Sequence, residues 1–149
     1  MVLTVVIAGC NNNAYFEEIR PVEDELWDMR DIKEFIVNAN DTEANYRLIF
    51  TVRNTTDYAY SNLYLFFTTT YPDQKITHDT IECLLADRSG QWLGKGVGKY
   101  RESRFLINDR LNFPDTGNYR FTLEQAMRDE ILTGIADVGL RIENITQAN

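Results

Sequence analysis

Apolar and polar residues alternate with a period of two along much of this chain, which is the pattern of β-strands that bury one face. The clearest example covers positions 46–53, where every second residue is apolar or aromatic. We expect this face to point into a core, and its members are Tyr46, Leu48, Phe50 and Val52. Similar alternation recurs over residues 33–39, 79–85, 104–107, 119–123 and 137–144, and residues 62–71 form a β-branched and aromatic run.

Turn-forming sequences separate these strands and indicate the fold class. Clusters of Asn, Asp, Thr, Gly and Pro follow several of them, for example at residues 40–42, 54–57 and 114–117. Seven or eight short strands of this kind predict an all-β protein built as an antiparallel β-sandwich. Within that class we favour a jelly-roll arrangement, although strand order cannot be read from the pattern.

The length of 149 residues fits one folded domain, because a chain of this size buries roughly 68–70% of the surface that it exposes when unfolded. We assign the β-sandwich to residues 31–149. Residues 10–30 are acidic, mixed in pattern and interrupted by Pro21, so we interpret them as a tether and N-terminal segment. Trp27, which lies in this segment, is expected to pack across a sheet edge.

One short helix is predicted near the C-terminus, over residues 123–132 with the sequence LEQAMRDEIL. Thr122 and Gln125 have the spacing of a capping box, in which two side chains bond the free amide groups at a helix start. Gly134 stands where a helix C-cap is expected. The helix would cross between late strands of the sandwich.

The first ten residues differ in composition from the rest of the chain. Residues 2–7 are apolar except for Thr4, and they lead into the small residues Ala8 and Gly9 and then Cys10. This order resembles a bacterial lipoprotein signal, which is too short to span a bilayer, although no basic residue opens it. Residues 1–9 are therefore predicted to be a signal peptide, and Cys10 the acylated residue, with palmitate as a typical acyl group. The alternative is a buried first strand in which the cysteine is incidental.

Cys10 and Cys83 are the two cysteines of the sequence. If Cys10 carries a lipid, Cys83 has no disulfide partner and is expected to be a small buried hydrophobic residue. A disulfide between the two is the alternative, since an exported compartment permits it. We favour the free, buried thiol.

The charge balance limits the possible partners. Lys and Arg total 15 against 23 Asp and Glu, so the formal net charge is −8. Such a chain repels phosphate backbones, and we therefore expect no nucleic-acid partner. An anionic bilayer surface is disfavoured on the same ground, which leaves the N-terminal lipid as the predicted contact with a membrane.

The residues needed for catalysis or metal binding are scarce. His78 is the single histidine, and it lies in an alternating run where a half-exposed strand position is expected. Its neighbour Asp79 would point to the opposite face, so the two do not form an acid–base pair. No calcium-loop or phosphate-loop spacing occurs. We therefore predict no catalytic residue, no metal site, no cofactor and no enzymatic activity.

Three glycines follow Trp92 at every second position: Gly94, Gly96 and Gly98. In an extended segment they would share one face and leave it bare, so another backbone or ring could approach it. Two interpretations remain open, a tight bend packed over a flat aromatic ring and a docking groove for a partner. The candidate contact residues for a partner protein or a glycan are Trp92, Gly94, Gly96, Tyr58 and Tyr60.

Several segments of the sequence resemble the gliding motility lipoproteins of the GldH family. They are residues 7–10, the region of Trp27, and residues 46–54, 58–63, 79–96, 117–121, 125–128 and 137–143. The most specific elements are Trp-Leu-Gly-Lys-Gly at 92–96 and Ala-Met-Arg at 126–128. The resemblance covers nearly the whole mature chain.

This resemblance implies a non-enzymatic lipoprotein of the cell envelope of a Gram-negative bacterium, anchored in the inner or the outer membrane. Its expected partners are other envelope proteins, including those of the gliding machinery. The acylated cysteine of the family is the one functional residue that carries over, and it falls on Cys10. The alternative function is a carbohydrate-binding jelly-roll module, because such folds often stack sugars on exposed aromatic rings.

Overall fold

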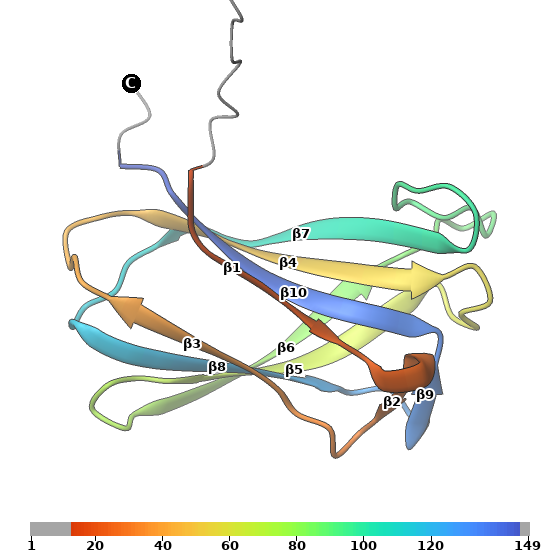
Figure 1. Cartoon of the computed structure of the whole chain (residues 1–149), viewed down its shortest axis with the longest axis horizontal. Helices are drawn as coiled ribbons and strands as arrows, with labels where there is room; N and C mark the ends of the chain where they lie inside the picture. The colour runs from red at the N-terminus through yellow and green to blue at the C-terminus, as the bar shows by residue number, and fades with distance from the viewer. Residues whose placement is uncertain (1–12, 147–149) are drawn as a thin grey trace, which may run out of the picture.

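Strands that alternate between buried and exposed residues build nearly all of the fold (Figure 1). The structure is a computed structural model, and it describes residues 13–146. The strands in this range are β1 (Ala14–Pro21), β2 (Leu26–Asp28), β3 (Lys33–Ala39), β4 (Tyr46–Thr55), β5 (Asn62–Thr70), β6 (Ile76–Leu84), β7 (Tyr100–Leu111), β8 (Gly117–Gln125), β9 (Ile131–Thr133) and β10 (Ile135–Asn144). A 3₁₀ turn, η1 (Glu23–Glu25), connects β1 to β2.

Two four-stranded antiparallel sheets pack face to face, as the two layers in Figure 1 show. Their strand orders are β1-β10-β4-β7 and β3-β8-β5-β6. The pairs β1–β10, β3–β8, β4–β7 and β5–β6 are nested along the chain, so the earliest strand pairs with the latest. This nesting is the jelly-roll arrangement, and the predicted antiparallel sandwich is confirmed.

The strand between positions 46 and 55 lies at the centre of the core. Tyr46, Leu48, Phe50 and Val52 are all buried, which confirms the face expected from the sequence. The ring of Phe50 on β4 meets Phe67 on β5 edge to face, with centroids 5.0 Å apart, so this contact joins the two sheets.

The helix predicted over residues 123–132 is wrong. β8 continues to Gln125 with an alternating burial pattern, a loop follows, and residues 131–133 form β9, which pairs with β2. Strand pairing outweighs local helix propensity here, because Leu123 and Gln125 are buried in register with Lys33 and Leu65 of neighbouring strands.

The sandwich begins earlier than the sequence indicated. β1 lies within residues 10–30, which the sequence assigned to a tether, yet it pairs with β10 along its length, from Ala14 opposite Glu143 to Pro21 opposite Asp137. An ion pair between Glu17 and Arg141 joins the two strands. Cys10 and the predicted signal peptide lie outside the described residues. Within residues 13–146, no helix has the length and apolar character that crossing a bilayer requires.

The two ends of the sandwich differ in what they carry. At one end β1 begins and β10 finishes, and we call it the near end (Figure 1). The other end, the far end, carries η1 and the short β2–β9 pair. The loops at residues 56–61, 85–99 and 126–130 also lie at the far end, since they connect the strand ends that meet there.

Candidate functional site

The contact residues proposed from the sequence lie in two loops of the far end. Tyr58 and Tyr60 precede β5, whereas Trp92, Gly94 and Gly96 belong to the connection between β6 and β7. Backbone hydrogen bonds join these loops, for example from the amides of residues 85 and 86 to the carbonyl of residue 61, at 2.8 and 3.0 Å. The two sets of residues nevertheless have different surroundings.

The tyrosine pair consists of one buried and one exposed ring. Tyr58 is 4% exposed, its hydroxyl donates to the Asn62 carbonyl at 2.7 Å, and burial raises its pKa. Tyr60 is 38% exposed and donates to the Asp129 carboxylate at 2.7 Å, a bond that raises the pKa of Tyr60. The rings meet edge to face. The buried Tyr58 ring therefore packs against the partly exposed Tyr60 ring, and the two rings do not form one flat exposed surface.

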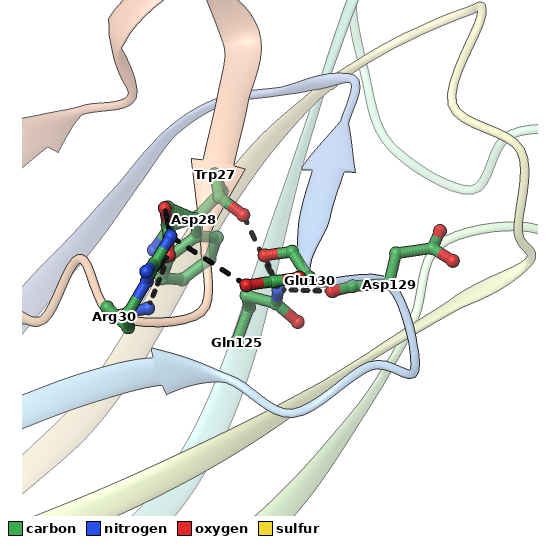
Figure 2. Close-up of polar contacts among 6 residues, drawn as sticks. All are labelled: Trp27, Asp28, Arg30, Gln125, Asp129 and Glu130. Carbon is green, nitrogen blue, oxygen red and sulfur yellow. Dashed lines mark hydrogen bonds and ion pairs between the residues drawn. The ribbon is translucent and has the colours of Figure 1, made fainter.

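Gln125 fixes the shape of the loop at residues 126–130 (Figure 2). Its side chain is 2% exposed, at the end of β8. The Nε2 group donates to the Asp129 carbonyl at 2.8 Å, with longer contacts to the Trp27 and Glu130 carbonyls, and Oε1 accepts from the Met127 amide at 2.9 Å. The two short bonds give the buried amide partners and tie residues 127 and 129 to the end of β8, so they brace the loop.

A second brace secures β2 beside this loop, and Figure 2 shows its contacts of Arg30 with Asp28 and Glu130. Trp27 is fully buried and its indole Nε1 donates to the Asp31 carbonyl at 2.8 Å. The Arg30 guanidinium binds the Asp28 carboxylate at 2.7 and 2.9 Å, and these hydrogen bonds lower the pKa of Asp28 to about 2. Each charged group here has its partner, so we interpret the cluster as structural rather than reactive.

The braced loop forms one wall of a shallow pocket of about 370 Å³. Its lining defines what we call the tyrosine–methionine pocket: Tyr60, Tyr64, Ala126, Met127 and Arg128. The Tyr64 amide donates to the Met127 sulfur at 3.2 Å, and the Ala126 amide donates to the Tyr64 carbonyl at 2.8 Å. Aromatic rings, an adaptable methionine and an arginine are the side chains that protein contact surfaces favour.

Sequence reasoning found only part of this pocket. It proposed Tyr60 but missed Tyr64, Met127 and Arg128. The available signal was the specific Ala-Met-Arg element at 126–128, which the helix prediction had placed on a helix instead of a loop.

The glycine segment is an irregular loop and not an extended segment whose glycines share one bare face. Isolated bridges Ala86–Trp92 and Lys95–Glu102 are the pairings described between residues 85 and 99. A Cβ at Gly94 would lie 2.8 Å from the Glu102 carbonyl oxygen, and one at Gly96 would lie 2.2 Å from that of Tyr100. The glycines therefore let the loop approach the backbone of β7 rather than a flat ring, and Trp92 packs partly buried against the core.

Other potentially reactive groups have structural surroundings. His78 is exposed on β6, with a ring nitrogen 3.1 Å from the Thr68 hydroxyl. Cys83 is fully buried, and burial raises the pKa of its thiol to about 12, so it behaves as a hydrophobic residue. Among residues 13–146, no three histidine, cysteine or acidic side chains gather in a way that would hold a metal ion.

The fold and the pocket define a jelly-roll β-sandwich protein with a braced pocket at its far end. The sequence matches the family model described as GldH lipoprotein over residues 14–142, from β1 into β10, and the chain belongs to this family. The resemblance noted in the sequence is thereby confirmed.

Two curated relatives extend this match over nearly the full length of each chain. The gliding motility lipoprotein GldH homolog of Christiangramia forsetii is 31% identical over 146 residues, which cover 93% of this chain and 89% of that protein. The gliding motility lipoprotein GldH of Flavobacterium johnsoniae is 27% identical over 150 residues, which cover 96% of this chain and 92% of that protein.

Proposed function

We propose that this chain is a non-enzymatic gliding-motility lipoprotein of the cell envelope, which a lipid on Cys10 anchors and which contacts other envelope proteins through the tyrosine–methionine pocket. The names of the matched family and relatives support lipid attachment and a role in motility. The observation that carries the contact role is the pocket itself, whose loop is held in place by the buried amide of Gln125.

The direction of β1 supports a lipid anchor at the near end and a partner contact at the far end. Ala14, the first residue of β1, follows Cys10 by four positions, a stretch that spans at most about 14 Å. A lipid on Cys10 would therefore hold the near end close to a membrane. β1 then extends for roughly 26 Å to η1 at the far end. Because the pocket lies at that end, it would point away from the membrane.

The carbohydrate alternative requires a platform of exposed aromatic rings. Tyr58 is buried and Trp92 packs against the core, so two of the proposed sugar-stacking residues are not freely presented. The remaining rings, Tyr60 and Tyr64, flank a methionine and an arginine rather than a row of hydrogen-bonding groups. We therefore favour a protein partner.

Lipid attachment is tested by Cys10→Ser in cells supplied with labelled palmitate. The wild-type protein should incorporate the label and sediment with membranes, whereas Cys10→Ser should lose the label and move to the soluble fraction. Loss of the acyl chains removes about 0.8 kcal/mol of membrane binding for each buried CH₂ group. Asn13→Ser serves as the control and should remain labelled. Label on the Cys10→Ser protein would contradict the assignment.

The contact role is tested with a photo-crosslinking residue placed at position 127 of the membrane-anchored protein. Illumination of native membranes should give a discrete adduct with an envelope protein, because Met127 lines the pocket. The same residue at Ile36, which is exposed in the middle of β3 on the same sheet, is the control and should not give that adduct.

A second substitution ties the adduct to the pocket. Tyr64→Ala should reduce its yield about tenfold, as expected for the loss of an aromatic contact residue. Ile76→Ala, an exposed residue elsewhere on this sheet, should leave the yield unchanged. Equal adducts from positions 127 and 36, or none from position 127, would refute a contact at this pocket.

A further inference from the structure

The two long sides of the sandwich are closed differently. Between β1 and β3, the Tyr15 hydroxyl donates to the Asn38 carbonyl at 2.6 Å and the Lys33 ammonium donates to the Pro21 carbonyl at 2.9 Å. On the opposite side β6 and β7 are the last strands of their sheets, and within residues 13–146 they do not pair with each other. This second side is therefore open.

β7 presents unpaired backbone groups along the open side. The Lys95 and Glu102 amides each donate to the other residue's carbonyl at 2.8 Å, so the backbone groups of Glu102 point away from β4. Alternate residues of an antiparallel strand direct these groups to the same side, and Arg104 and Leu106 therefore face the same edge. Beyond Lys95, no strand in the described part of the chain pairs with this edge. Such an edge is a template for another strand.

Two hollows lie along the inner face of the same edge. One, of about 670 Å³, is lined by Leu84, Leu93, Phe105 and the buried Ser103, whose hydroxyl has no hydrogen-bond partner among residues 13–146. The other, of about 370 Å³, is lined by Ile107 and by the aromatic residues behind it. Phe105 and Ile107 are two positions apart on β7, so the hollows have the spacing of alternate side chains on one face of a strand.

The segment at positions 95–110, which contains most of β7 and the loop residues before it, has a charge opposite to that of the whole chain. Positions 95–110 contain five basic residues, Lys95, Lys99, Arg101, Arg104 and Arg110, and two acidic residues, Glu102 and Asp109. Their formal charge is therefore +3, whereas the chain carries −8. Within residues 13–146, Lys95 and Arg110 form no ion pair, and Arg104 reaches only Glu102, at 3.7 Å. A partner with acidic residues is the complementary one.

We propose that β7 binds an extended acidic segment of a partner protein as an added antiparallel strand. Apolar residues at alternate positions of that segment fill the two hollows, and acidic residues between them lie beside Lys95 and Arg104. The main-chain groups of Arg104 and Leu106 supply the hydrogen bonds, and the hollows select the side chains. This surface shares no lining residue with the tyrosine–methionine pocket, so either contact can form without the other.

A peptide in which valine and glutamate alternate is the probe for this site. It should bind the full chain saturably in fluorescence anisotropy, and its addition should shift the amide resonances of Arg104 and Leu106. One control peptide has the same composition with its valines placed together, and another replaces glutamate by lysine. Neither control should bind comparably.

Two variants locate the binding. Arg104→Glu should weaken the peptide's affinity about tenfold, while Arg120→Glu, on the outer face of the other sheet, should not. Leu106→Pro removes an amide that points away from β4, a change that edge strands tolerate, and it should abolish binding without loss of the folded spectrum.

Several results would overturn the proposal. One is that the alternating peptide does not bind saturably, and another is that either control peptide binds equally well. A third is that the resonance shifts occur at Tyr64 and Met127 instead of Arg104 and Leu106. A dimer in sedimentation that Leu106→Pro dissociates would also overturn it. That result would show that β7 pairs with β7 of a second copy and not with a partner protein.

Discussion

Phe50→Ala is expected to lower the free energy of unfolding by about 3–5 kcal/mol, the usual cost of emptying a buried aromatic site. Phe50 is fully buried, pairs across the sheet with Leu140 and Phe105, and contacts Phe67 of the opposite sheet. Its removal leaves a cavity that two sheets cannot close, because each is held by its own backbone hydrogen bonds.

The measurement is a urea melt of the purified chain, with Ile19→Ala as the matched control. Ile19 is an exposed strand residue, so its loss should change the free energy of unfolding by less than about 0.5 kcal/mol. A change below about 1 kcal/mol for Phe50→Ala would contradict the burial of this face.

Gly96→Val should lower the melting temperature and destabilise the fold by about 1–3 kcal/mol. The added Cβ would lie 2.2 Å from the Tyr100 carbonyl oxygen, far inside van der Waals contact. Tyr100 belongs to β7 and is paired with Thr55, so its backbone cannot move aside without disturbing the sheet.

Val97→Ala is the control, because Val97 is 96% exposed, and Lys95→Ala should also leave the melting temperature unchanged. Unchanged melting of Gly96→Val together with lost co-purification of envelope partners would favour the docking interpretation of the glycine segment. Unchanged melting and unchanged partners would make it an ordinary loop.

The alternating pattern predicted the sandwich because burial in a strand repeats every two residues and is written locally in the sequence. The inward faces of β4 and β10 follow directly from it, including Phe50 and Leu140. The helix prediction failed because residues 123–132 combine helix-favouring residues with a capping-box spacing, while the competing partners are distant in sequence. Gln125 bonds the Trp27 carbonyl, and Leu123 lies opposite Lys33.

Contact partners that the local pattern does not contain explain the other corrections. β1 appeared to be a tether because its partner strand, β10, lies at the opposite end of the chain. Gly94 and Gly96 have the spacing of one strand face. In the structure they instead let their loop lie close to the backbone of Glu102 and Tyr100 in β7, a contact that the spacing does not encode. The pocket combines β5 with a loop after β8, so Tyr60 gave no indication of Met127.

The pairing of β1 with β10 determines how the protein would respond to mechanical load. A pull between a lipid on Cys10 and a partner held at the far end would run along β1, parallel to its length. Such a force shears every hydrogen bond between Ala14 and Pro21 at once, whereas a pull across the strand would break them one after another. Glu17, paired with Arg141, adds an ionic link across the same interface. Tension between such an anchor and a partner at the far end would therefore load β1 in its resistant direction.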